Sequence, residues 1–154
     1  MSAVVFRREP RLRDMQPEDL PAVMEVEVAA YEFPWTFGIF RDCMRYGYVC
    51  KVLGSGDGPI GHGIMSVSAG ECHLLNICIH PRYQGQGYGT GMISDLLEIA
   101  RSRHAQTALL EVRVSNKAAY HVYSKLGFHE IGMRRSYYPA RKGREDAIIL
   151  ACDL

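Results

Sequence analysis

Gln84-Gly85-Gln86-Gly87-Tyr88-Gly89 is the stretch that decides the fold of this 154-residue chain. It follows an apolar strand candidate over residues 71–79 and precedes a helix with an apolar face at Met92, Ile93, Leu96, Leu97 and Ala100. Glycines at the start of a helix let backbone N–H groups converge on an anion, and the positive end of the helix dipole adds to the attraction. The stretch therefore predicts a site for a phosphate or pyrophosphate.

Two familiar nucleotide motifs fit these glycines poorly. A P-loop requires a lysine directly after its last glycine, and none follows here. A dinucleotide-binding fingerprint needs its third glycine elsewhere and usually opens the domain, whereas here three strand candidates come before the strand that leads into this turn. A tight connection without a ligand is the structural alternative.

The segments on either side of this turn indicate the architecture. Before it we expect a strand over residues 11–15, helices over 17–31 and 36–46, and strands over 48–53 and 60–68 joined by a glycine turn. After it we expect a strand over 108–114, a helix from about 117 to 126 and a strand pair over 128–138 and 146–152. This order predicts an α+β, three-layer α/β/α fold, with a mixed sheet of about seven strands and four helices. Residues 1–10 are expected to be an extension and 11–154 a single domain.

Composition narrows the class of protein further. Lysine and arginine total 18 against 17 acidic residues, so no specific nucleic-acid binding is expected. The chain has no long apolar run and its start lacks the order of a signal peptide, which predicts a cytoplasmic protein without membrane contact. Its 5 cysteines form no CxxC pair and its 6 histidines no HExxH, so we expect reduced thiols and no metal.

The pattern Gln84-x-x-Gly87-x-Gly89 resembles the [RQ]xxGx[GA] motif of the GCN5-related N-acetyltransferase (GNAT) superfamily. The order of elements resembles that superfamily from about Arg11 onward. The resemblance implies a GNAT fold that uses acetyl-CoA, with the turn holding the pyrophosphate and the preceding strand pairing with the pantetheine arm. The residues it implies for this role are Ile77, Cys78, Ile79, Gln84, Gly85, Gln86, Gly87, Tyr88, Gly89 and Thr90.

Two polar residues outside this turn are candidates for acid–base chemistry. Glu111 lies within the apolar run Leu109-Leu110-Glu111-Val112, where a carboxylate needs a partner or a function. An ion pair with Arg113, two residues further on the same face of the strand, is its structural explanation. Tyr123 lies on the helical face that also carries Asn116, and packing in the core is its structural explanation.

The runs around these residues resemble the RimI family of ribosomal-protein-alanine N-acetyltransferases. The runs that carry the resemblance are Leu110-Glu111-Val112-Arg113-x-Ser115-Asn116, Tyr123-x-x-Leu126-Gly127-Phe128, Phe33-Pro34-Trp35, Asn76-Ile77, Arg134-Arg135-x-Tyr137-Tyr138-Pro139 and residues 143–149. The resemblance implies that Glu111 is the general base, that Tyr123 is the general acid and that Asn116 contacts coenzyme A. It also implies direct transfer of acetyl from acetyl-CoA to the N-terminal alanine of the eighteenth small-subunit ribosomal protein.

For the acceptor side, we expect Trp35, Tyr137 and Tyr138 to be walls of a peptide groove, since aromatic side chains give large contact areas at low entropy cost. Core packing is the alternative for Trp35. Arginines and lysine between residues 134 and 144 form a basic cluster that either faces solvent or meets a polyanion. Two other functions remain open: a broader N-terminal or lysine acetyltransferase on the same fold, and a coenzyme A-binding module without catalysis.

Overall fold

The computed structural model describes residues 9–154 of the chain. The predicted order of elements is confirmed, with strands and helices as follows: β1 (Arg11–Asp14), α1 (Leu20–Ala30), α2 (Phe37–Arg45), β2 (Val49–Ser55), β3 (Gly58–Ser68), β4 (Glu71–Ile79), α3 (Tyr88–Ser102), β5 (Thr107–Arg113), α4 (Lys117–Lys125), β6 (His129–Pro139) and β7 (Arg144–Asp153). All but the last two residues of the expected extension over 1–10 lie outside the described residues.

The first helix begins later than the sequence indicates. Residues Pro17–Asp19 form a 3-10 turn, and the α-helix starts at Leu20. The Asp19 carboxylate accepts a hydrogen bond of 2.7 Å from the Gln16 backbone N–H and faces the Arg13 guanidinium at 2.8 Å. These contacts fix the tighter turn ahead of the helix.

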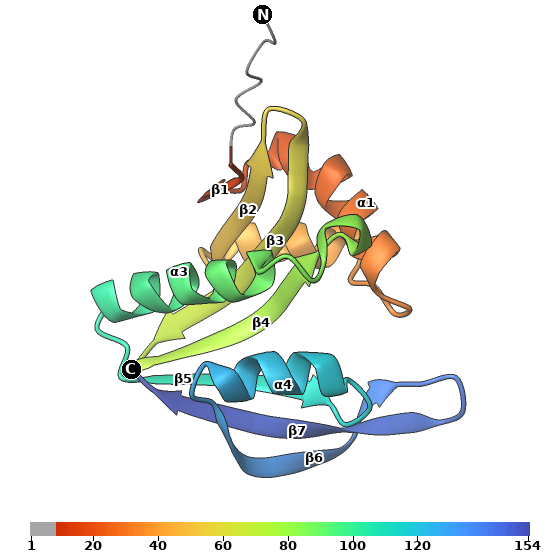
Figure 1. The fold of residues 1–154 in the computed structure, drawn as a ribbon, viewed down its shortest axis with the longest axis vertical. Helices are drawn as coiled ribbons and strands as arrows, with labels where there is room; N and C mark the ends of the chain where they lie inside the picture. The colour runs from red at the N-terminus through yellow and green to blue at the C-terminus, as the bar shows by residue number, and fades with distance from the viewer. Residues whose placement is uncertain (1–8) are drawn as a thin grey trace, which may run out of the picture.

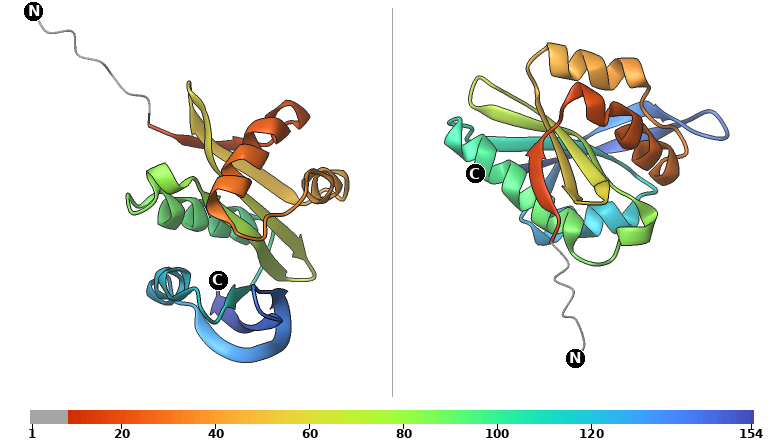
Figure 2. Two further views of the ribbon diagram at one scale, coloured as in Figure 1. Left: turned by 90° about the vertical axis from the view of Figure 1, so that its right-hand side faces the viewer. Right: turned by 90° about the horizontal axis from the view of Figure 1, so that it is seen from above.

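The seven strands form one mixed sheet in the order β1-β2-β3-β4-β5-β7-β6. Neighbouring strands are antiparallel except for β4 and β5, which are parallel and are joined through α3. Helices α3 and α4 lie on one face of the sheet, and α1 and α2 on the other (Figure 2). This is the three-layer arrangement that the sequence predicts. Among residues 9–154, none of the helices has the length and apolar character needed to span a bilayer.

The sheet opens in its middle, between its two parallel strands. Only residues Glu71–Leu74 of β4 pair with β5, opposite Thr107–Leu110. At the same point the β3–β4 register shifts between Ile64 and Met65, so Leu75 is an extra residue in β4. Beyond it the two strands separate, as Figure 1 shows, and the second half of β4 keeps a neighbour on its β3 side only.

Two apolar cores hold β4 in place, one on each face of the sheet. The face under α3 and α4 buries Met92, Ile93, Leu96, Leu97 and Ala100, the five residues that the helical spacing predicts. The opposite face packs α1 and α2 onto the sheet through Val23, Phe40, Val52 and Ile64, all 0% exposed. Because both faces are packed, the gap between β4 and β5 is held open by a rigid frame.

Candidate functional site

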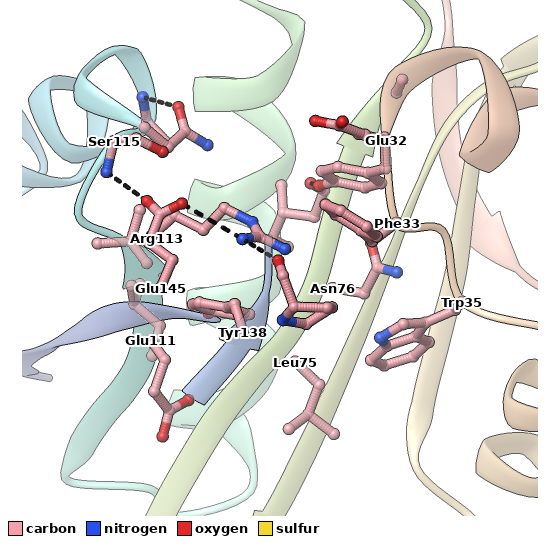
Figure 3. Close-up of a pocket in the computed structure, with 18 of the residues that line it drawn as sticks. Glu32, Phe33, Trp35, Leu75, Asn76, Glu111, Arg113, Ser115, Tyr138 and Glu145 are labelled. Atoms are coloured by element: carbon pink, nitrogen blue, oxygen red, sulfur yellow. Dashed lines mark hydrogen bonds and ion pairs between the residues drawn. The ribbon is translucent and has the colours of Figure 1, made fainter. Parts of the chain in front are cut away.

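A cavity of about 780 Å³ occupies the opening between β4 and β5. Its walls come from four parts of the chain: the end of α1 with the loop that follows, the middle of β4, the second half of β5 with the start of α4, and the β6–β7 turn. Figure 3 shows Glu32, Phe33 and Trp35 on one side of this cavity and Arg113, Ser115 and Glu145 on the other. Segments more than a hundred residues apart in the sequence therefore share one site.

The glycine turn lies between the end of β4 and α3. Gly85 and Gly87 have φ angles of +76° and +87°, which strongly favour glycine, and Gly87 is the N-cap of α3. No side chain within residues 9–154 caps this helix, and a Cβ on either glycine would meet nothing within 4 Å. The Gln84 side chain does not bond the start of α3, because its amide donates to the Ile79 carbonyl at 2.9 Å. The first N–H groups of α3 thus remain available to an anion.

The unpaired half of β4 faces the cavity at Asn76 and Ile77. The Tyr31 hydroxyl donates to the Ile77 carbonyl at 2.5 Å, which links the end of α1 to this strand. Cys78 is buried, and burial together with the nearby Glu27 carboxylate raises the pKa of its thiol well above the usual range. A protonated thiol is a poor nucleophile, so Cys78 has no sign of covalent chemistry.

Glu111 lines the cavity, and its partners differ from the one that the sequence suggests. The structural alternative, an ion pair with Arg113, does not form, because Arg113 instead contacts Glu145 at 3.4 Å. Glu111 Oε2 lies 2.5 Å from His73 Nε2, and Arg134 Nε donates to Oε1 at 3.2 Å. The carboxylate is therefore held between β4 and β6 rather than by its own strand.

These partners determine the protonation of Glu111. Partial burial alone would raise its pKa, but the hydrogen bond from His73 and the charges of His73 and Arg134 outweigh burial and lower the pKa from 4.5. The carboxylate is consequently ionised at neutral pH. It can accept a proton, although a lowered pKa makes it a weak base.

Tyr123 and Asn116 reach the cavity from α4. The Tyr123 ring packs edge-on against Phe128 with centroids 5.6 Å apart, so it also has the core role that its residue type suggests. Burial raises the pKa of Tyr123 to about 12, which keeps its hydroxyl protonated at any physiological pH. Asn116 is the N-cap of α4, where its Oδ1 accepts from the Ala119 N–H at 3.2 Å. Both residues line the cavity.

Arg113 connects two walls of the cavity, the loop after α1 and the β6–β7 turn. Its guanidinium carbon lies 5.3 Å from the centre of the Phe33 ring and 4.5 Å from that of Tyr138, and Nη1 donates to the Pro139 carbonyl at 2.7 Å. An ion pair between Arg141 and Glu32 bridges the same two loops. Figure 3 shows Arg113 extending between these two walls.

The three aromatic residues expected to form a peptide groove divide into two groups. Trp35 and Tyr138 line the cavity, and the Trp35 ring also packs against the buried Phe40 ring, with centroids 5.3 Å apart. Tyr137 is 44% exposed and is not among the lining residues. The basic cluster is similarly divided, because Arg134, Arg141 and Arg144 each contact a different partner.

A buried carboxylate lies beneath the cavity. Glu27 is 1% exposed and accepts hydrogen bonds from His62 Nε2 at 3.0 Å, from Asn76 Nδ2 at 3.0 Å and from the Trp35 backbone N–H at 3.1 Å. Glu27 therefore joins α1, β3, β4 and the loop between α1 and α2. Side-chain atoms of Glu27, His62 and Cys78 lie within 4.8 Å of one another, but the protonated thiol and the existing hydrogen bonds do not favour a metal.

The profile of the acetyltransferase (GNAT) family matches residues 11–128, about three quarters of the chain. The chain belongs to this family. The GNAT enzymes are acyltransferases, and the match covers the glycine turn, β4, Glu111 and Tyr123.

Relatives with assigned functions narrow the resemblance within the GNAT family. The chain is 38% identical to the ribosomal protein bS18-alanine N-acetyltransferase of Escherichia coli K12 over 91% of this chain and 95% of the relative. Its identity to the enzyme of the same name from Haemophilus influenzae is 36% over 88% of this chain and 93% of the relative. The crystal structure of the E. coli ribosomal-protein-S18-alanine N-acetyltransferase superposes with a TM-score of 0.87 at 37% identity, covering 94% and 93% of the two chains. This GNAT chain is thus a member similar to the RimI enzymes.

Sequence reasoning missed three residues of this site. Glu27 is recognised in the sequence only as part of the helical spacing, Tyr31 as the end of a helix, and His73 as one of several scattered histidines. Each acts through a contact more than 30 residues away: Glu27 with His62, Tyr31 with Ile77, and His73 with Glu111. A polar residue in an otherwise apolar strand is the signal that His73 and Glu111 share.

Proposed function

We propose that this GNAT enzyme transfers acetyl from acetyl-CoA to the N-terminal α-amine of a protein, namely the alanine terminus of ribosomal protein bS18. One observation carries the proposal: a cavity lies between the unpaired edge of β4 and an ionised carboxylate, and the chain that leaves this strand runs into the uncapped N-terminus of α3. The relatives named for bS18 support the choice of acceptor.

The residues present fit acetyl-CoA. The turn from Gly85 to Thr90 would hold the pyrophosphate through its N–H groups, and the edge of β4 at Ile77–Ile79 would bind the pantetheine arm. Asn116 would contact coenzyme A through its amide nitrogen, since its oxygen caps α4. Acetyl-CoA supplies an activated acyl group, so the protein has only to position the amine and to manage protons.

Glu111 and Tyr123 are our candidates for the two proton tasks. An N-terminal amine has a reference pKa of about 7.7–8.0, so part of it is already neutral near pH 7, and a weak base suffices to accept its proton as the C–N bond forms. Glu111 would do so, either directly or through a water molecule. Tyr123, with its raised pKa, would serve mainly as a hydrogen-bond donor to the departing sulfur, because complete transfer of its proton is unfavourable.

The acceptor would enter between the loop at Phe33–Trp35 and the β6–β7 turn. Aromatic side chains contribute to both walls of this entrance, with Trp35 on one side and Tyr138 on the other. Tyr137, exposed next to Tyr138, would contact a longer peptide. We place the enzyme in the cytoplasm, where ribosomal proteins are made, and expect it to need no metal.

Steady-state acetylation of two matched peptides tests this proposal. One peptide carries the free N-terminus of bS18, and the other has the same sequence with a blocked N-terminus and an internal lysine. We expect product on the free N-terminus alone. Transfer to lysine alone would favour a lysine acetyltransferase on the same fold. Binding of acetyl-CoA without transfer to either peptide would favour a non-catalytic module.

A further inference from the structure

His73 places an imidazole, the kind of side chain that ordinarily changes charge near neutral pH, against Glu111. It lies on β4, three residues before Asn76, and its Nε2 is 2.5 Å from Glu111 Oε2. The His73 side chain is 32% exposed, whereas that of Glu111 is only 9% exposed. His73 is not among the residues that line the cavity, so it contacts Glu111 from outside the cavity.

The surroundings of this pair come from three strands. From β6, Arg134 donates to the other oxygen of Glu111 at 3.2 Å, and the Tyr138 hydroxyl lies near the same carboxylate. From β5, Arg113 shares the face of Glu111 but is engaged by Glu145. Among residues 9–154, these are the charged or titratable groups that the structure places against Glu111. Of these residue types, only histidine ordinarily changes charge between pH 5 and 8.

The charge of His73 therefore decides how strongly Glu111 holds a proton. When the imidazole is protonated, the carboxylate lies between two cations, His73 and Arg134, and its affinity for a proton is lowest. When the imidazole is neutral, it still donates Nε2–H to the carboxylate but one cation is gone. The carboxylate is then the better base.

We propose that His73 is a positioning residue that controls the basicity of Glu111 through its own charge. This inference rests on the proposed role of Glu111 as the base. In the proposed reaction the proton passes from the acceptor ammonium to Glu111, and His73 determines how readily it does so without touching the acceptor. Turnover should consequently fall as the pH decreases through the range in which His73 takes up a proton.

The pH profile of kcat at saturating substrates, in the wild type and in His73→Gln, tests this proposal. Glutamine keeps a donor to Glu111 but carries no charge at any pH. We expect wild-type kcat to fall by about tenfold between pH 8 and pH 5.5, and the His73→Gln value to change less than threefold over this range. The acceptor amine is the same in both proteins, so a difference between the profiles comes from His73. Parallel profiles would overturn the proposal.

A second substitution separates charge from packing. His73→Lys retains a cation at this position throughout, so we expect its kcat to be low and to resemble that of the wild type at pH 5.5. If His73→Gln and His73→Lys give the same profile, the charge is irrelevant and His73 has only a structural role. Circular dichroism of both variants checks that they fold, which the partial exposure of His73 favours.

A measurement without any acceptor keeps this inference distinct from the proposed function. The ring resonances of His73 are followed by NMR against pH in the wild type and in Glu111→Gln. Loss of the carboxylate should move the midpoint of the His73 titration to lower pH. If the wild type fails to acetylate the bS18 peptide but this midpoint moves, the proposed acceptor is wrong and the coupled pair stands. An unchanged midpoint overturns the inference even in an active enzyme.

Discussion

Replacing Glu27 by alanine should destabilise the protein far more than any surface change in the same helix. The substitution leaves three donors without their acceptor: His62 Nε2, Asn76 Nδ2 and the Trp35 backbone N–H. Each stranded buried donor costs about 1–3 kcal/mol, and truncating the Glu27 side chain removes the acceptor of all three donors at once. Because Glu27 and Asn76 border the cavity, water can reach part of this network, so we expect a total of about 3–5 kcal/mol.

Urea denaturation followed by circular dichroism measures this loss. For a domain of this size it corresponds to a fall in Tm on the order of 10 °C. Glu25→Ala is the matched control, since Glu25 lies in the same helix and is exposed, and we expect it to cost less than about 0.5 kcal/mol. Glu27→Gln keeps one acceptor oxygen and should fall between the two. A cost below about 1 kcal/mol for Glu27→Ala would refute the assignment of Glu27 as the centre of the network.

Four further predictions concern the site itself. Gly87→Ala forces a residue with a Cβ to adopt a φ of +87°, at a cost of about 1–3 kcal/mol. We expect it to weaken acetyl-CoA binding, measured by calorimetry, on the order of tenfold. Gly91→Ala, where a Cβ also meets nothing within 4 Å, is the control. Tyr123→Phe should lower turnover at least about tenfold with little change in acetyl-CoA affinity, and equal turnover would remove Tyr123 from the mechanism. Cys78→Ala should remain active, whereas an acetylated cysteine in the wild type by mass spectrometry would contradict direct transfer. The pKa of Glu111 is lower in the folded protein than its unfolded value of 4.5, so its ionised form stabilises the fold above pH 4.5, and this contribution is lost as the pH falls through the folded pKa. The free energy of unfolding should therefore decrease less steeply with acid in Glu111→Gln than in the wild type.

Local patterns predicted most of the fold, because they depend on residues close in the sequence. The spacing of Met92, Leu96 and Ala100 indicates the buried face of α3, and Asn116 caps α4 as its residue type suggests. The glycine turn has the positive φ angles that its composition favours. Each of these features needs only the geometry of one helix or one turn.

The contacts that the sequence does not reveal are those between distant strands. Glu111 and Arg113 share a strand face, so a local rule pairs them, yet His73 and Arg134 hold Glu111 instead. The extra residue at Leu75, which separates β4 from β5, depends on the β3–β4 register and has no glycine or proline to mark it. Sheet register is a property of the whole fold, and side-chain partners follow from it.

The short pairing between β4 and β5 explains why both halves of the proposed reaction meet in one place. At its paired end, β4 brings His73 beside Leu109 and thus within reach of Glu111 two residues further along β5. At its unpaired end, the same strand presents the edge proposed for acetyl-CoA. If pairing continued past Leu74, the edge would be covered and the cavity filled; if it ended earlier, His73 would no longer be aligned with β5. The position of the bulge at Leu75 therefore sets both the binding edge and the partner of the proposed base.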